Sequence, residues 1–158
     1  MAARLQAEHQ KRLQYRWHDR HRAIEVALDD LRAWLYRQKR AQSRGLRIEW
    51  PEGTRRLRQL RGKVAEFFRI EAWLSIPGAF ANGEITDERR VASESHARQS
   101  AVDRFNVLTL LDELILRTER TPESERWQPA LHEFDELIDR LERHMDSEAD
   151  SLLWFHHN

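Results

Sequence analysis

One histidine and one glutamate interrupt an apolar stripe near the end of this 158-residue sequence. The stripe steps by three or four residues, which predicts one buried face of a helix. Its members are Ala130, Phe134, Leu137, Leu141, His144, Glu148, Leu152 and Phe155. His144 and Glu148 lie one helical turn apart on that face, and burying such groups is costly unless other polar groups pair with them. The chemistry of this face therefore depends on the side chains that lie opposite.

Three other segments offer side chains that can face this pair. The first, at residues 3–42, has an apolar stripe with one histidine, formed by Leu13, Trp17, His21, Ile24, Leu28, Leu31 and Leu35. The second has a stripe with one carboxylate, formed by Leu57, Leu60, Val64, Phe67, Glu71 and Leu74. The third contains His96. If His96 points inward, the residues on the same side of the helix are Ala92, Asp103, Val107, Leu110 and Leu114. Imidazole nitrogens and carboxylate oxygens together suit iron, zinc or manganese.

The register of these residues is more informative than their spacing. The spacing His-x-x-x-Glu occurs three times, starting at His21, His132 and His144, and this composition produces it readily by chance. Only the pair of His144 and Glu148 has both members in an apolar stripe. A weak internal repeat aligns Glu71 with Glu148 and Phe67 with His144.

The elements that position these residues are expected to be four helices. Only 5 Gly and 4 Pro interrupt a chain in which 34% of the residues are charged, which fits long helices with solvated outer faces. We expect them at about 3–42, 54–76, 86–117 and 130–155, with short connections that make neighbours antiparallel. The prediction is one all-α domain over 1–158, an up-down-up-down four-helix bundle with a long N-terminal helix.

Glycine, proline and capping residues mark the expected helix ends. Gly45 suits the position after the first helix, and the stretch Trp50-Pro51-Glu52-Gly53 is assigned to the following loop. Thr54 is then the expected N-cap of the second helix. The remaining boundaries are expected at Ile76-Pro77-Gly78, at Thr86 and at Pro129.

The composition excludes several kinds of site and partner. There is no cysteine, so disulfides and thiolate metal sites are excluded. No apolar run approaches the roughly 20 residues that a membrane-spanning helix needs, and no signal-peptide pattern begins the chain, so we expect a cytoplasmic protein. There is no glycine-rich phosphate loop and no G-x-S-x-G motif, so we expect a binding protein and not an enzyme.

The charge is balanced overall but unevenly placed. Residues 1–70 hold 18 Lys and Arg against 8 Asp and Glu, while residues 71–158 hold 9 against 19. A basic arm that binds nucleic acid is one interpretation. We favour the other, in which two basic helices pack beside two acidic ones, because the two excesses cancel.

The order of the polar stripe residues resembles the hemerythrin-like, or HHE cation-binding, domain family. The likeness runs from about Tyr15 to Phe155 and includes the helix lengths and the tryptophan, Trp127, before the last helix. Such domains carry histidine, then His-x-x-x-Glu, then histidine, then His-x-x-x-Glu, and they bind a non-heme di-iron centre inside a four-helix bundle. The resemblance implies iron as the cofactor. It implies one metal on His21 and the other on His96 and His144, with Glu71 and Glu148 as bridges.

The sequence departs from the family pattern at Phe67, where such domains have a histidine. Phenylalanine cannot coordinate a metal, and it fills the space that one would need. Three outcomes remain open. A single metal is held by His96, His144 and the two glutamates; or His18, one turn before His21, replaces the missing ligand; or no metal binds and the polar groups hydrogen-bond to one another.

Three kinds of function follow from these alternatives. The first is a hemerythrin-like protein with a reduced iron site that serves dioxygen or nitric oxide binding, iron handling or redox sensing. The second is a metal-free four-helix module that serves as a scaffold or interaction partner. The third is a helical protein that binds nucleic acid through its basic N-terminal helix, against which the cancelling charges argue.

Overall fold

The computed structural model describes residues 1–74, 87–119 and 131–157, without the side chains of residues 89 and 151–157. These residues form four helices: α1 at Ala2–Ser43, α2 at Trp50–Leu74, α3 at Asp87–Glu119 and α4 at Leu131–His157. No strand occurs in these three ranges, and the all-α prediction is confirmed. No helix within them is apolar over a length that could cross a membrane.

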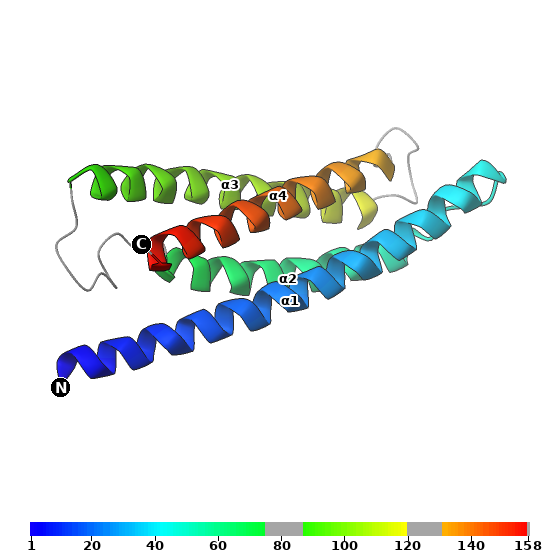
Figure 1. Cartoon of the computed structure of the whole chain (residues 1–158). Coiled ribbons are helices and arrows are strands. Elements are labelled where there is room, and N and C mark those ends of the chain that lie inside the picture. Colours follow the sequence, from blue (N-terminus) through cyan, green and yellow to red (C-terminus); the bar gives the residue numbers. More distant parts are fainter. Residues whose placement is uncertain (75–86, 120–130, 158) are drawn as a thin grey trace.

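Consecutive helices run in opposite directions along the bundle (Figure 1). Each helix packs against its neighbour in sequence, and α4 also packs against α1. This is the up-down-up-down arrangement that short connections favour. α1 is 42 residues long, and its first nine residues are all exposed, so the start of this helix adds nothing to the core.

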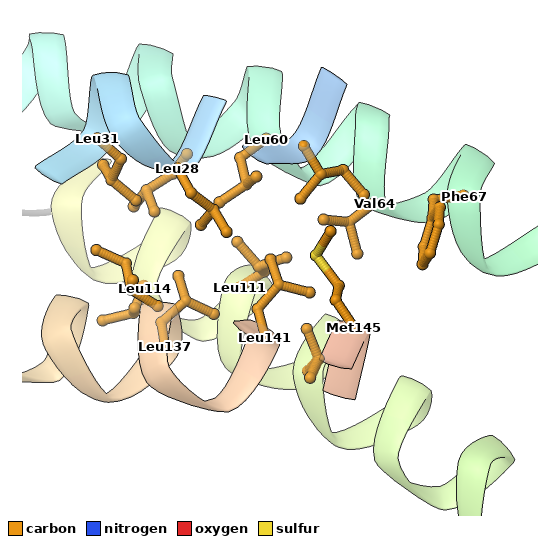
Figure 2. Packing of buried hydrophobic residues seen from close by; sticks show 14 of the residues in the cluster. Leu28, Leu31, Leu60, Val64, Phe67, Leu111, Leu114, Leu137, Leu141 and Met145 are labelled. Atoms are coloured by element: carbon orange, nitrogen blue, oxygen red, sulfur yellow. The ribbon is translucent and has the colours of Figure 1, made fainter. Parts of the chain in front are cut away.

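The predicted apolar stripes of α1, α2 and α4 form the core. Side chains from all four helices interdigitate there, with Phe67 at one end of the cluster drawn in Figure 2. Every predicted stripe residue of α2 is buried, and so are those of α1 except His21, which is half-buried. In α4 the stripe residues with described side chains, Phe134 to Glu148, are buried. These stripes fix how each helix is rotated and which polar groups face inward.

The predicted inward face of α3 is partly wrong. Val107 and Leu114 are buried as expected, and His96 is half-buried, but Ala92 is exposed. The buried face instead runs through Ser100, Val107, Leu111, Leu114 and Thr118. The pattern was hard to read because α3 also carries large apolar side chains that face outward, among them Val102 and Phe105.

α1 ends as predicted, but α2 begins four residues earlier than expected. Gly45 has φ of 71°, and its N–H bonds to the carbonyl of Gln42, a helix ending that glycine favours. Trp50 to Gly53, assigned to a loop, form the first turn of α2, and Thr54 lies inside the helix. Proline fits a first helical turn because it lacks only an N–H that would be unsatisfied there. Trp50 is buried against Trp34, and this packing outweighs the capping signal of Thr54.

Ion pairs join the basic helices to the acidic ones. On the outside of the bundle α1 is paired with α4 through Arg32–Glu142 and Lys39–Asp135, and α2 with α3 through Arg61–Asp112. Basic residues of α1 and α2 therefore face acidic residues of α3 and α4, as the interpretation of balanced charges requires. Such exposed pairs contribute about 0–1 kcal/mol each. They therefore influence which helices lie side by side but add little to the stability of the bundle.

Several predicted features lie outside the described residues. They are the turn at Ile76-Pro77-Gly78, the cap at Thr86, Trp127, Pro129 and Ala130. The side chains of Leu152 and Phe155, in the last turns of α4, are outside them as well. α3 begins at Asp87 with two acidic residues in its first turn, and α4 begins at Leu131, close to the positions expected.

Candidate metal centre

Glu71, His144 and Glu148 meet inside the bundle. Glu71 comes from the end of α2, and the other two come from one face of α4. Each offers a nitrogen or oxygen atom, and these atoms all lie within 4.8 Å of one another. All three side chains are at most 5% exposed, so water is largely excluded from the group. The structure thus brings together three of the five residues that the sequence singled out.

His144 and Glu71 form the central contact of this group. Nε2 of His144 lies 2.8 Å from Oε2 of Glu71, a hydrogen bond in which the imidazole donates to the carboxylate. The ring of Phe68 meets the His144 ring edge to face, with centroids 5.1 Å apart, and holds the imidazole in place. The pairing links α2 to α4 across the bundle.

His96 lies at the edge of the group. Its Nε2 atom is 3.3 Å and 3.4 Å from the two carboxylate oxygens of Glu148, so α3 reaches the same site. Its side chain is 26% exposed, in contrast to 3% for that of Glu148. His96 is therefore the member of the set that is open to solvent.

His21 does not reach this group. Its Nδ1 pairs with Glu25 at 3.2 Å on the surface of α1. Its Nε2 is buried and has no hydrogen-bond partner among the described residues. Its ring packs against the rings of Trp17 and Phe67, at centroid distances of 4.9 Å and 6.0 Å. His21 thus packs against Phe67, the residue at which the sequence departs from the hemerythrin-like pattern.

His18 is exposed, with its ring against Trp17, and so takes no part in the site. His9 and His132, which lie in none of the apolar stripes, are also exposed.

Arg104 is a member of the site that the sequence did not reveal. It lies on α3 two turns after His96, and Nη1 of its guanidinium is 3.7 Å from Oε2 of Glu71. The same nitrogen donates a 2.8 Å hydrogen bond to the hydroxyl of the buried Ser100. The four-residue spacing of His96, Ser100 and Arg104 was the available signal, because it places all three on one helical face.

The buried charges shift the pKa values of the group. Burial raises the pKa of Glu71 above its ordinary value, although the hydrogen bond from His144 and the charge of Arg104 act against this. Burial alone would lower the pKa of His144, but the hydrogen bond and charge of Glu71, with Glu148 and Asp103, raise it above its ordinary value. Burial lowers the pKa of His21 in its aromatic surroundings, in spite of Glu25. Glu71 and His144 together therefore retain a proton that a metal ion would have to displace.

A cavity connects the site to the surface between α3 and α4. Its volume is about 250 Å³, and it is lined by Asp103, Asn106, Val107, Arg140, Arg143, His144 and Ser147. Because His144 is part of the lining, a small molecule can approach the imidazole without unfolding of the helices.

The residues present fit a single metal ion. One imidazole and two carboxylates form a buried donor set, and His96 can complete it from the third helix. A second ion is a poor fit, since fully buried Phe67 packs against His21 and offers no donor atom.

No family model, curated protein or solved structure matches this chain.

Proposed function

We propose that this chain is a hemerythrin-like metal-binding protein whose site is reduced to one ion. The observation that carries the proposal is the buried group of Glu71, His144 and Glu148, whose donor atoms lie within 4.8 Å of one another. Buried carboxylates are costly unless they are paired or bind a cation. The order of the site residues along the chain adds the likeness to the hemerythrin-like pattern, and this likeness makes iron the expected metal.

The residues around such a site would have different roles. Glu71, His144 and Glu148 would hold the ion, with His96 as a fourth ligand. The core around Phe67 and Phe68 excludes water from one side, and the cavity beside His144 leaves the other side open to small molecules. Bound iron would supply reversible affinity for a small ligand such as dioxygen or nitric oxide, or a change of redox state.

A second candidate function is a metal-free helical module that acts as a scaffold or interaction partner. It is favoured by the way in which the buried polar groups already pair with each other: His144 with Glu71, His96 with Glu148 and Arg104 with Glu71. Such pairs can be nearly neutral for stability when they are fully hydrogen-bonded.

Elemental analysis of protein purified with iron present separates the two. About one metal per chain supports the metal-binding function, and His144→Gln is expected to abolish it because the central ligand is lost. His132→Gln is the matched control, since His132 is an exposed histidine on the same helix. A metal content under about 0.1 per chain in the unmodified protein would exclude the proposal and leave the metal-free module.

A further inference from the structure

Arg104 brings a permanent positive charge into the candidate metal centre. Its side chain is only 13% exposed, and its guanidinium lies 3.7 Å from Oε2 of Glu71. Guanidinium groups stay protonated in proteins, so this charge cannot be removed by titration. Burying it is costly unless a partner compensates, and the fully buried carboxylate of Glu71 is that partner.

The position of Arg104 is fixed by a second contact. The guanidinium donates a 2.8 Å hydrogen bond to Ser100, whose side chain is itself buried one turn earlier on α3. Arg104 is therefore held against Glu71 by a residue of its own helix. This arrangement differs from that of the exposed ion pairs on the outside of the bundle, where both side chains are open to water.

Arg104 and a metal ion would use the same carboxylate. Oxygen Oε2 of Glu71 lies within 4 Å of Arg104 and within hydrogen-bond distance of His144, in the group that offers metal ligands. Two cations near one oxygen repel each other strongly where water is scarce. Metal binding to Glu71 would therefore favour a turn of the guanidinium away from the site and toward solvent.

We infer that Arg104 is an internal cation that competes with the metal for Glu71. In the metal-free protein its charge adds to that of His144 in compensating the buried carboxylate of Glu71, which lies close to Glu148. In the metal-loaded protein it opposes the ion, lowers the affinity and disfavours a second ion. This inference rests on the proposed metal-binding function and adds to it a residue that sets the affinity of the site.

The test compares the zinc affinity of the metal-stripped protein with that of Arg104→Gln. Zinc is the probe because it takes nitrogen and oxygen ligands and has no redox chemistry. We expect Arg104→Gln to bind Zn²⁺ about tenfold more tightly, within the range typical of coupling between two sites. We also expect its melting temperature in chelator to be lower than that of the unmodified protein. Arg98→Gln, an exposed arginine on the same helix, makes the same change in net charge and should alter neither quantity.

The possible outcomes distinguish failure of this inference from failure of the proposed function. Equal or weaker zinc affinity in Arg104→Gln overturns the inference and leaves the proposed function intact. Zinc binding by the variant but not by the unmodified protein supports the inference and refutes the proposed function. Binding by neither refutes both. If Arg104→Gln does not fold without metal, Arg104→Met keeps the aliphatic stem without the charge, and the same comparison applies to it.

Discussion

Replacing Phe67 by histidine should rebuild the second metal position. Phe67 is fully buried, and its ring lies 6.0 Å from that of His21, whose inward nitrogen has no hydrogen-bond partner among the described residues. Residue 67 is also one helical turn before Glu71, so the new imidazole would share a face with that carboxylate. The variant would thus supply the histidine ligand that the hemerythrin-like pattern has at this position and this sequence lacks.

The cost of Phe67→His without metal can be worked from its burial. Truncating a buried phenylalanine to alanine costs about 3–5 kcal/mol, and histidine retains most of the ring but buries a polar group at about 1–3 kcal/mol. A net loss of about 3 kcal/mol is expected, or about 6–12 °C in melting temperature for a chain of this size. Metal at about 100 times its dissociation constant returns about 2.7 kcal/mol, which nearly cancels the loss.

The assay is thermal unfolding with chelator and with iron, together with elemental analysis. Phe67→His should melt lower than the unmodified protein in chelator, recover most of the difference with iron, and bind about two metals per chain instead of one. Phe134→His is the matched control, because Phe134 is equally buried at the other end of the core beside Trp34. A second metal position beside residue 67 is refuted if Phe67→His gains no metal, or if iron raises the melting temperature of Phe134→His by as much as that of Phe67→His.

Three further predictions follow from single contacts. In chelator, the free energy of unfolding should fall as pH rises above 6.5, because the pKa of His144 is raised in the folded state, which then keeps a proton that the unfolded chain releases. The raised pKa of Glu71 acts in the same direction from pH 4.5 upward. Urea titrations at several pH values check the sign of this dependence. Glu148→Leu should change stability by less than about 1 kcal/mol in chelator, since one of two facing buried carboxylates is removed, but it should abolish stabilisation by iron; a large loss in chelator would contradict this. Gly53→Ala should cost about 1–3 kcal/mol, because its Cβ would lie 2.7 Å from the buried ring of Trp34. Gly62→Ala, whose Cβ would have nothing within 4 Å, should be neutral or stabilising by about 0.5–1 kcal/mol in the same urea titration.

The fold was predictable where one helix face is apolar and the other is charged. In α1, α2 and α4 the stripes identified both the helix and its buried face, including the inward positions of Glu71, His144 and Glu148. The start of α2 was not predictable from capping signals, because the burial of Trp50 against Trp34 decides it, and that contact joins two helices. Local sequence carries no information about such a contact.

The site was predictable in part for a similar reason. Polar residues in apolar stripes are visible in a sequence, and these gave Glu71, His144 and Glu148. The inward face of α3 was obscured because exposed Phe105 balances buried Ser100, so the helix has no single apolar side. For Arg104 the sequence offered only its spacing from His96 and Ser100. That spacing does not reveal the contact with Glu71, because an arginine is ordinarily solvated and the pairing depends on the position of another helix.

The most direct test of the central claim is a titration of metal-stripped protein with ferrous iron under anaerobic conditions, followed by calorimetry. We expect saturable binding of about one ion per chain, with release of the proton that Glu71 and His144 share in the metal-free protein. His144→Gln should show no binding, while His132→Gln should behave like the unmodified protein. Absence of saturable binding to the unmodified protein, or binding that His144→Gln retains, would contradict the claim that Glu71, His144 and Glu148 form a metal centre.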